Sequence, residues 1–228
     1  MGRFVVIGVD ERGAAARAAV ALSERRSDVW ATVGQHPHDA VALDDALQTE
    51  LRALAARPRV VAVGEVGLDY HYDHSPRELQ ATVFRQMIHL AKRLGKPLVI
   101  HTRSAPLETL LILEEEGARD VGGIIHCFSE DRAFAQRALD LDFDLSFSGI
   151  VTFRTAKAIQ DVATWAPEGR ILVETDSPYL APMPLRGKKN EPSNIVHTAR
   201  FIAGLRGIAP EQLSETTSDN ATRRLRLV

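Results

Sequence analysis

Short apolar runs alternate with longer segments of helical character along the chain. Seven such runs, rich in Val, Ile and Phe, predict β-strands. They lie at residues 3–9, 28–34, 59–65, 97–102, 122–128, 143–149 and 170–176. The runs are continuously apolar rather than alternating with polar residues, which is typical of parallel strands buried on both faces of a sheet. The pattern therefore favours an α/β protein.

The segments between the runs carry apolar residues at helical spacing, as in residues 13–26 and 46–57. The clearest helix boundaries surround the third of these segments. Ser75 and Pro76, followed by Glu78, indicate the start of a helix, and Gly95 indicates its end.

The alternation of strand and helix predicts a TIM-type (β/α) barrel, in which parallel strands are each followed by a helix. Such a barrel has eight βα units, and seven are visible here. The last strand is followed by a loop and helical segments, and the first begins at residue 3, so we expect the missing unit to be the first one. We expect residues 1–228 to form a single domain, because their number suits one α/β domain and no linker interrupts them.

Four side chains that can bind metal lie where apolar runs end: Glu65, His101, His126 and Asp176. The carboxyl ends of all barrel strands open onto one face, so these four should converge. Each histidine alone is better explained by a hydrogen bond in the core than by a metal, but two of them together with Glu65 reverse this and favour a metal. The mixed nitrogen and oxygen set suits Zn, Mn or Mg with open coordination positions. We predict a metal-dependent hydrolase.

Composition and net charge limit the binding partners and the cellular compartment expected of such an enzyme. The formal net charge of −2 gives no general basic field, so a nucleic acid would have to be held by a local patch or by the metal. Cys127 is the single cysteine, which excludes an internal disulfide and suits a reducing compartment. No signal peptide and no apolar stretch of membrane-spanning length is visible. We expect a cytoplasmic protein without a membrane partner.

Basic side chains near the strand ends could contact phosphate. Arg103 follows His101 by two residues, and its planar guanidinium suits a phosphate oxygen pair. The loop after the last strand carries Arg186, Lys188 and Asn190, at the position where such barrels often bind phosphate. A solvated salt bridge or charged surface is the alternative for each.

Glu174 shares a strand face with Asp176, because side chains alternate along a strand. Two roles are open for its carboxylate. It could orient Asp176 or touch the substrate, or it could form an interior ion pair.

Several longer segments together resemble the TatD family of metal-dependent deoxyribonucleases. They occur in the family's order across the whole chain, as VGQHPHDA, AVGEVGLDY, KPLVIHTRSA, GGIIHCFSE, LVETDSPYLAPMPLRGKKNEPSN and NATRRL. The resemblance implies hydrolysis of DNA ester bonds, often from 3′ to 5′, by two divalent ions in a TIM-type barrel.

The resemblance also implies a role for individual residues. Glu65 would bridge the ions, and His101 and His126 would be ligands of the second ion. Asp176 would bind the first ion beside the attacking water and accept its proton. His36, the first histidine of the HPH segment, would reach the substrate phosphate. Family members also open with a strand that ends in His-x-His, and no segment here corresponds to it, so we expect one or two ions.

The predicted function is a metal-dependent deoxyribonuclease of the 3′-5′ exonuclease type, acting on single-stranded DNA or 3′ ends. Glu65 and Asp176 would be its catalytic residues. One alternative is a catalytically weakened or inactive relative that binds metal or nucleic acid. Another is a hydrolase of a non-phosphate ester such as aminoacyl-tRNA, because the fold alone does not fix the substrate. A glutamate at the bridging position favours the nuclease.

Overall fold

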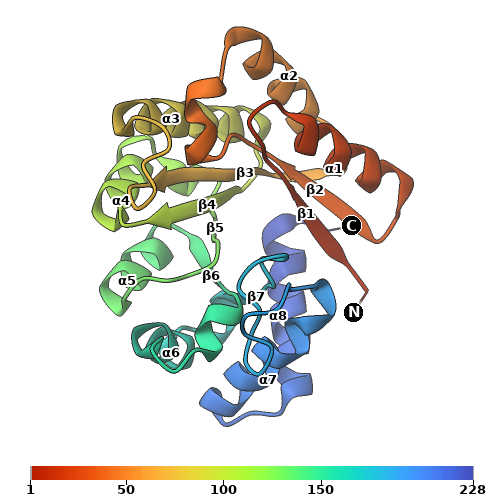
Figure 1. The fold of residues 1–228 in the computed structure, drawn as a ribbon, viewed down its shortest axis with the longest axis vertical. Helices are drawn as coiled ribbons and strands as arrows, with labels where there is room; N and C mark the ends of the chain where they lie inside the picture. The colour runs from red at the N-terminus through yellow and green to blue at the C-terminus, as the bar shows by residue number, and fades with distance from the viewer. Residues whose placement is uncertain (1, 228) are drawn as a thin grey trace. The chain divides into compact units, whose positions relative to one another are not determined.

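The computed structural model describes residues 2–227, which alternate strands and helices in the predicted order (Figure 1). All seven predicted strands are present, and the α/β class is confirmed. The strands are β1 (Phe4–Gly8), β2 (Val29–Val33), β3 (Val60–Asp69), β4 (Leu98–Arg103), β5 (Gly123–Ile125), β6 (Phe143–Phe147) and β7 (Ile171–Val173).

An α-helix follows each of these strands, in some cases after a 3-10 turn or a loop. The α-helices are α1 (Ala14–Arg25), α2 (Asp45–Ala55), α3 (Arg77–Leu94), α4 (Pro106–Glu115), α5 (Arg132–Asp140), α6 (Lys157–Trp165), α7 (Ile195–Arg206) and α8 (Pro210–Leu225). Short 3-10 turns are η1 (Pro37–Ala42), η2 (Ala118–Asp120), η3 (Gly149–Thr152), η4 (Glu168–Arg170) and η5 (Pro192–Asn194). Among the described residues, no helix combines the length and the apolar character that crossing a membrane requires.

The chain divides into two compact units. The first contains the residues up to Ile124 together with Leu225–Leu227, and the second contains Ile125–Arg224. In the first unit, β1 to β4 pair in sequence order, each parallel to the next. Helix α1 packs on β1 and β2, α2 on β2 and β3, and α3 on β3. The core of this unit contains Val63, Val66 and Leu68 of β3, which are fully buried.

In the second unit, β6 and β7 are parallel neighbours, and α5 packs on β6. Its core contains several aromatic rings. Phe128, Phe143 and Phe147 are fully buried, and the ring centroids of Phe128 and Phe147 lie 5.6 Å apart. The side chain of Asn220 in α8 donates hydrogen bonds to the carbonyls of Glu168 and Ile171, which fixes the last helix to the start of β7.

Helix α3 begins and ends where the sequence predicted. Pro76 precedes its first residue, and Gly95 follows its last residue with a left-handed φ of 61°. The N–H of Lys96 then donates to the carbonyl of Ala91, which closes the helix end.

Strand β3 is longer than predicted. The expected strand ended at Glu65. In the structure β3 continues to Asp69, which is in register with Arg103 of β4. Gly67 makes this possible, because a Cβ there would lie 1.9 Å from the carbonyl oxygen of His101. Glu65 therefore lies inside a strand and not at its end.

Candidate metal centre

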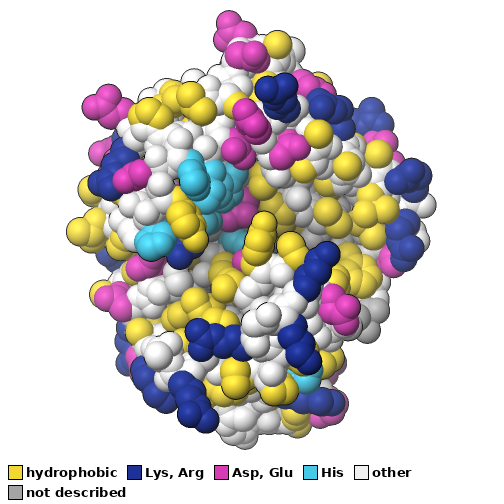
Figure 2. All heavy atoms as spheres, in the orientation of Figure 1, with side chains coloured by type: hydrophobic (Ala, Val, Ile, Leu, Met, Phe, Trp, Pro, Cys, Tyr) yellow, Lys and Arg dark blue, Asp and Glu magenta, His cyan; other side chains and the backbone are white. Residues whose placement is uncertain are grey.

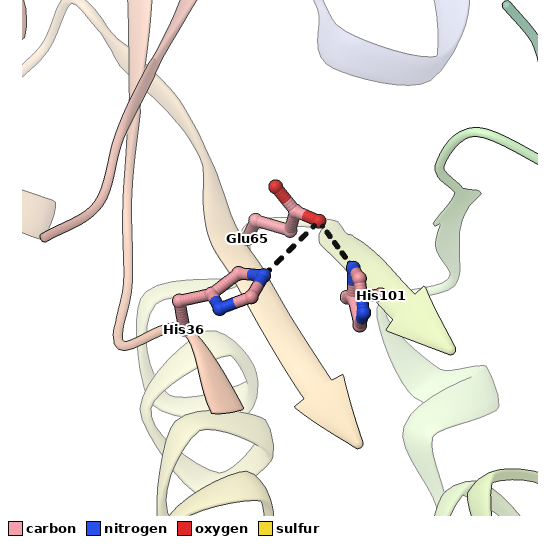
Figure 3. Close-up of side chains that lie close together, drawn as sticks. All are labelled: His36, Glu65 and His101. Carbon is pink, nitrogen blue, oxygen red and sulfur yellow. Dashed lines mark hydrogen bonds and ion pairs between the residues drawn. The ribbon is translucent and has the colours of Figure 1, made fainter. Parts of the chain in front are cut away.

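Three side chains that can bind metal meet in the first unit: His36, Glu65 and His101. Glu65 comes from β3, His101 from β4, and His36 from the turn between β2 and η1. Figure 3 shows both imidazoles directed at the same carboxylate oxygen. His101 Nδ1 lies 2.8 Å and His36 Nε2 lies 3.7 Å from Glu65 Oε1. Figure 2 shows a group of histidine side chains at the surface beside acidic and apolar ones.

Glu65 and His101 fit a divalent ion. Their facing atoms, Oε1 and Nδ1, are separated by about the distance expected of two donor atoms that each lie roughly 2.1 Å from one ion. The Glu65 side chain is only 11% exposed. A carboxylate buried to this degree requires a cation or hydrogen-bond donors beside it, which an ion or the imidazoles can supply.

A second carboxylate lies on the other side of the His101 ring. Asp69 Oδ2 is 3.1 Å from His101 Nε2 and 2.8 Å from His38 Nε2. Asp69 Oδ1 accepts the backbone N–H groups of His71 and Tyr72 at 3.0 and 2.9 Å. The Asp69 residue is fully buried.

Asp69 was not among the predicted site residues. It lies four residues after Glu65 on the same strand, and side chains at even separations share a strand face. The sequence did not point to Asp69 because the predicted strand ended at Glu65.

The protonation of this cluster follows from its hydrogen bonds. Burial by itself raises the pKa of Asp69, but hydrogen bonds from His101, the Tyr72 N–H and His38 outweigh it and hold the pKa far below its usual range. Burial likewise lowers the pKa of His101, but hydrogen bonds to Asp69 and Glu65 reverse the shift and raise it. Without metal, the two carboxylates therefore favour a positively charged ring between them, and metal binding would displace a proton from it.

His36 differs from His101 in the ring nitrogen that faces Glu65, which is Nε2 in His36 and Nδ1 in His101. Its Nδ1 accepts the backbone N–H of His38 at 3.2 Å. In a neutral imidazole one nitrogen accepts and the other carries the proton, so His36 presents Nε2–H toward the Glu65 side of the cluster. This makes it a hydrogen-bond donor to an oxygen atom.

The second unit contains a related arrangement around His126, which follows β5. His126 Nε2 lies 3.3 Å from Asp176 Oδ1, and His126 Nδ1 lies 2.8 Å from Glu174 Oε2. Glu174 also accepts hydrogen bonds from Ser146 Oγ at 2.7 Å and from the Cys127 N–H at 2.6 Å. Of the roles considered for Glu174, these contacts support orientation of a neighbouring side chain, but the side chain is His126 and not Asp176.

The predicted ligands thus pair within each unit. Glu65 and His101 lie together in the first, and His126 and Asp176 lie together in the second. Asp176 adopts a left-handed φ of 57°, a conformation that aspartate tolerates better than most residues. That all four ligands share one centre stays a prediction.

Arg103 lies beside an exposed aromatic group. Its guanidinium carbon is 4.7 Å from the ring centroid of Tyr72, and Tyr72 is 51% exposed. Tyr72 also stacks on His74, with ring centroids 5.5 Å apart. A cation and stacked rings at the surface offer contacts to a phosphate and to a base.

The loop after β7 carries exposed cationic side chains and one buried amide side chain. Arg186 and Lys188 are exposed, and the Arg186 guanidinium lies over the Phe153 ring at 4.4 Å. Asn190 is 3% exposed, and its amide donates to the Thr175 and Tyr179 carbonyls. Its contacts hold the loop in place, and its predicted contact with substrate stays a prediction.

Comparison with known proteins agrees with this chemistry. A protein of Bacillus subtilis, the uncharacterized metal-dependent hydrolase YabD, is 42% identical over 99% of this chain and 88% of its own length. A protein of Rahnella sp. described as the 3′-5′ ssDNA/RNA exonuclease TatD is 34% identical over 84% of this chain and 75% of its own length. The crystal structure of YJJV, a TatD homologue from Escherichia coli, superimposes with a TM-score of 0.92 at 25% identity and covers 99% of this chain and 87% of that one.

The family model described as TatD related DNase matches residues 1–226. The YJJV structure shares the fold over nearly the whole chain, and the Bacillus subtilis relative, matched over a similar length, is described as a metal-dependent hydrolase. The chain therefore belongs to the TatD-related DNase family of metal-dependent hydrolases.

Proposed function

We propose that the protein is a metal-dependent nuclease that hydrolyses phosphodiester bonds in single-stranded DNA or at 3′ ends. The observation that carries the proposal is the pairing of Glu65 with His101, at the spacing of two ligands, with Asp69 behind the imidazole. An oriented histidine and a carboxylate are typical ligands of catalytic divalent ions. The name of the Rahnella relative supports a nucleic acid as substrate.

Glu65 and His101 would hold an ion in the first unit, and His126 and Asp176 are the proposed metal ligands of the second unit. The donor set suits Mg, Mn or Zn. A bound ion would neutralise charge on the phosphate oxygens and lower the pKa of an attached water. Asp176 would accept the proton of the attacking water.

The remaining residues would position the substrate. His36 Nε2–H is a donor suited to a non-bridging phosphate oxygen. Arg103 would pair with a neighbouring phosphate while Tyr72 contacts a base. Arg186 and Lys188 would contact the backbone of the strand, since exposed cations bind phosphates regardless of sequence.

Cleavage of end-labelled single-stranded DNA tests the proposal. The protein is incubated with Mg²⁺ or Mn²⁺, with an EDTA control, and a parallel reaction contains single-stranded RNA. We expect metal-dependent shortening from the 3′ end and a loss of about 10²-fold or more in Asp176→Asn, because proton transfer by a positioned group contributes on that order. Asp161→Asn, an exposed aspartate paired with Arg132, is the matched control and should retain activity.

Metal content separates the remaining possibilities. We expect the double variant Glu65→Ala/His126→Ala to lose bound metal, and unchanged metal content would refute the ligand assignment. If the unaltered protein binds metal but cleaves no DNA or RNA at high enzyme concentration, a metal-binding relative without nuclease turnover is favoured. Hydrolysis of an aminoacyl-tRNA ester would then be the next activity to assay.

A further inference from the structure

We propose that Asp69 is a positioning residue that fixes the tautomers of two histidines, so that His101 offers Nδ1 to the metal. The inference rests on the proposed function, because it assumes an ion beside Glu65. The two oxygens of Asp69 have separate tasks. Oδ1 accepts the N–H groups of His71 and Tyr72, and Oδ2 faces the Nε2 atoms of His38 and His101.

An ionised carboxylate only accepts hydrogen bonds. Asp69 therefore selects the Nε2–H form of each ring that it contacts. For His101 this leaves the Nδ1 lone pair directed at Glu65, where the ion would bind. A hydrogen bond from the distal nitrogen of a metal-binding histidine to a carboxylate is the usual way in which proteins fix such a ring.

The second histidine extends the effect to His36. His38 Nε2 is held by Asp69, and the backbone N–H of His38 donates to His36 Nδ1. One carboxylate thus sets the His101 tautomer directly, and through His38 it supports the turn that makes His36 an Nε2–H donor.

Asp69 is itself held rigidly. Its N–H donates to Gln80 Oε1 at 2.8 Å, and Gln80 Nε2 donates to the carbonyls of Asp69 and Ser75 at 3.1 and 2.8 Å. Gln80 is fully buried in α3. The carboxylate therefore has a fixed backbone on which to present Oδ2.

The variant Asp69→Asn separates this role from packing. The two backbone N–H groups at the Oδ1 position require an acceptor, so they retain the amide oxygen there. The NH₂ group must then face His38 and His101. A donor at that position requires an unprotonated Nε2, which moves the proton of His101 to Nδ1 and blocks the metal position. An Asp-to-Asn change that leaves geometry intact but selects the wrong tautomer is known to disable a catalytic histidine.

Two measurements test the inference. The first is the affinity for Mn²⁺ by titration calorimetry. We expect Asp69→Asn to bind 10- to 100-fold more weakly, the loss typical of a removed orienting group. We expect Asp69→Ala to lose less affinity than Asp69→Asn, because alanine removes the acceptor without opposing it. The control is Asp73→Asn. Asp73 is an exposed residue of the loop after β3 and pairs with Arg77, so this variant should bind Mn²⁺ with normal affinity.

The second measurement is the tautomer of each ring, from ¹⁵N spectra of histidine-labelled protein at a pH that leaves the rings neutral. The His38 signals are recorded without metal, and the His101 signals are recorded with Zn²⁺ bound. The spectra of His38→Gln and His101→Gln assign these signals. We expect Nε2–H for both in the unaltered protein and Nδ1–H for His38 in Asp69→Asn. Two results would overturn the inference and leave the nuclease proposal intact. One is an unchanged His38 tautomer in Asp69→Asn, and the other is an Mn²⁺ affinity of Asp69→Asn within twofold of normal. Absence of Mn²⁺ binding by the unaltered protein would instead defeat the proposed function, and the metal-free His38 spectrum would still decide the role of Asp69.

Discussion

Replacement of Gly67 by alanine should distort the pairing of β3 with β4 and lower stability well beyond an ordinary glycine substitution. Gly67 is in register with His101 and has a φ of 144°. The added Cβ would lie 1.9 Å from the His101 carbonyl oxygen and 2.9 Å from its carbonyl carbon. Both obstacles are backbone atoms of a buried strand, so no side chain can rotate away to make room.

The expected loss can be worked from these contacts. Relief requires the strands to separate by at least about 1 Å at this point. The unfavourable φ costs about 1–3 kcal/mol. Weakening the two neighbouring ladder hydrogen bonds adds about 1 kcal/mol each. We therefore expect Gly67→Ala to lower the free energy of unfolding by about 3–5 kcal/mol.

Urea unfolding, followed by circular dichroism, measures this loss. Gly95→Ala is the matched control, because Gly95 also has a positive φ but a Cβ there would meet nothing within 4 Å. The control should lose only about 1–2 kcal/mol, the cost of a left-handed conformation. Equal losses in the two variants would show that backbone conformation, and not the close approach to His101, makes glycine necessary at position 67.

Two further predictions concern the ionic cluster of the second unit. Arg224→Met should lower the free energy of unfolding by about 1.5–3 kcal/mol in a urea titration, the contribution of hydrogen bonds to a charged group, because it removes two hydrogen bonds to the fully buried Asp144 while Arg170 and Arg223 still pair with that carboxylate. Arg200→Met, at an exposed position, should change it by less than about 0.5 kcal/mol. A hydrogen bond from Arg224 lowers the pKa of Asp142, so Asp142 contributes stability above its ordinary pKa and loses this contribution as pH falls through the lowered folded value. Urea midpoints measured between about pH 5 and pH 2 should therefore fall less steeply in Arg224→Met than in the unaltered protein, and parallel curves would contradict this coupling.

The elements that the sequence predicted correctly are those determined by local chemistry. Helix α3 follows from the apolar spacing of its buried face and from Gly95, whose left-handed φ ends it. The strands follow from apolar runs that are buried on both faces, as in β2 and β6. Glu65 and His101 could be identified because each belongs to such a run.

The features that the sequence did not predict depend on partners distant along the chain. The extension of β3 to Asp69 is stabilised by pairing with β4, and the predicted strand ended at Glu65 because nothing nearby in the sequence indicates the close approach of Gly67 to His101. Asp69 was missed for the same reason. The role of Glu174 stayed open because its partner, His126, lies 48 residues away in sequence.

The hydrogen bonds of Gln80 have a consequence for how this enzyme could diversify. Gln80 and Asp69 hold the two ends of the loop at residues 70–75 with buried groups, while Tyr72 and its neighbours at the tip point into solvent. Substitutions at the tip can therefore change what the loop contacts without moving the carboxylate behind His101. Natural variation or directed evolution of substrate preference should accumulate at positions 71–74, whereas positions 69 and 80 should tolerate almost none.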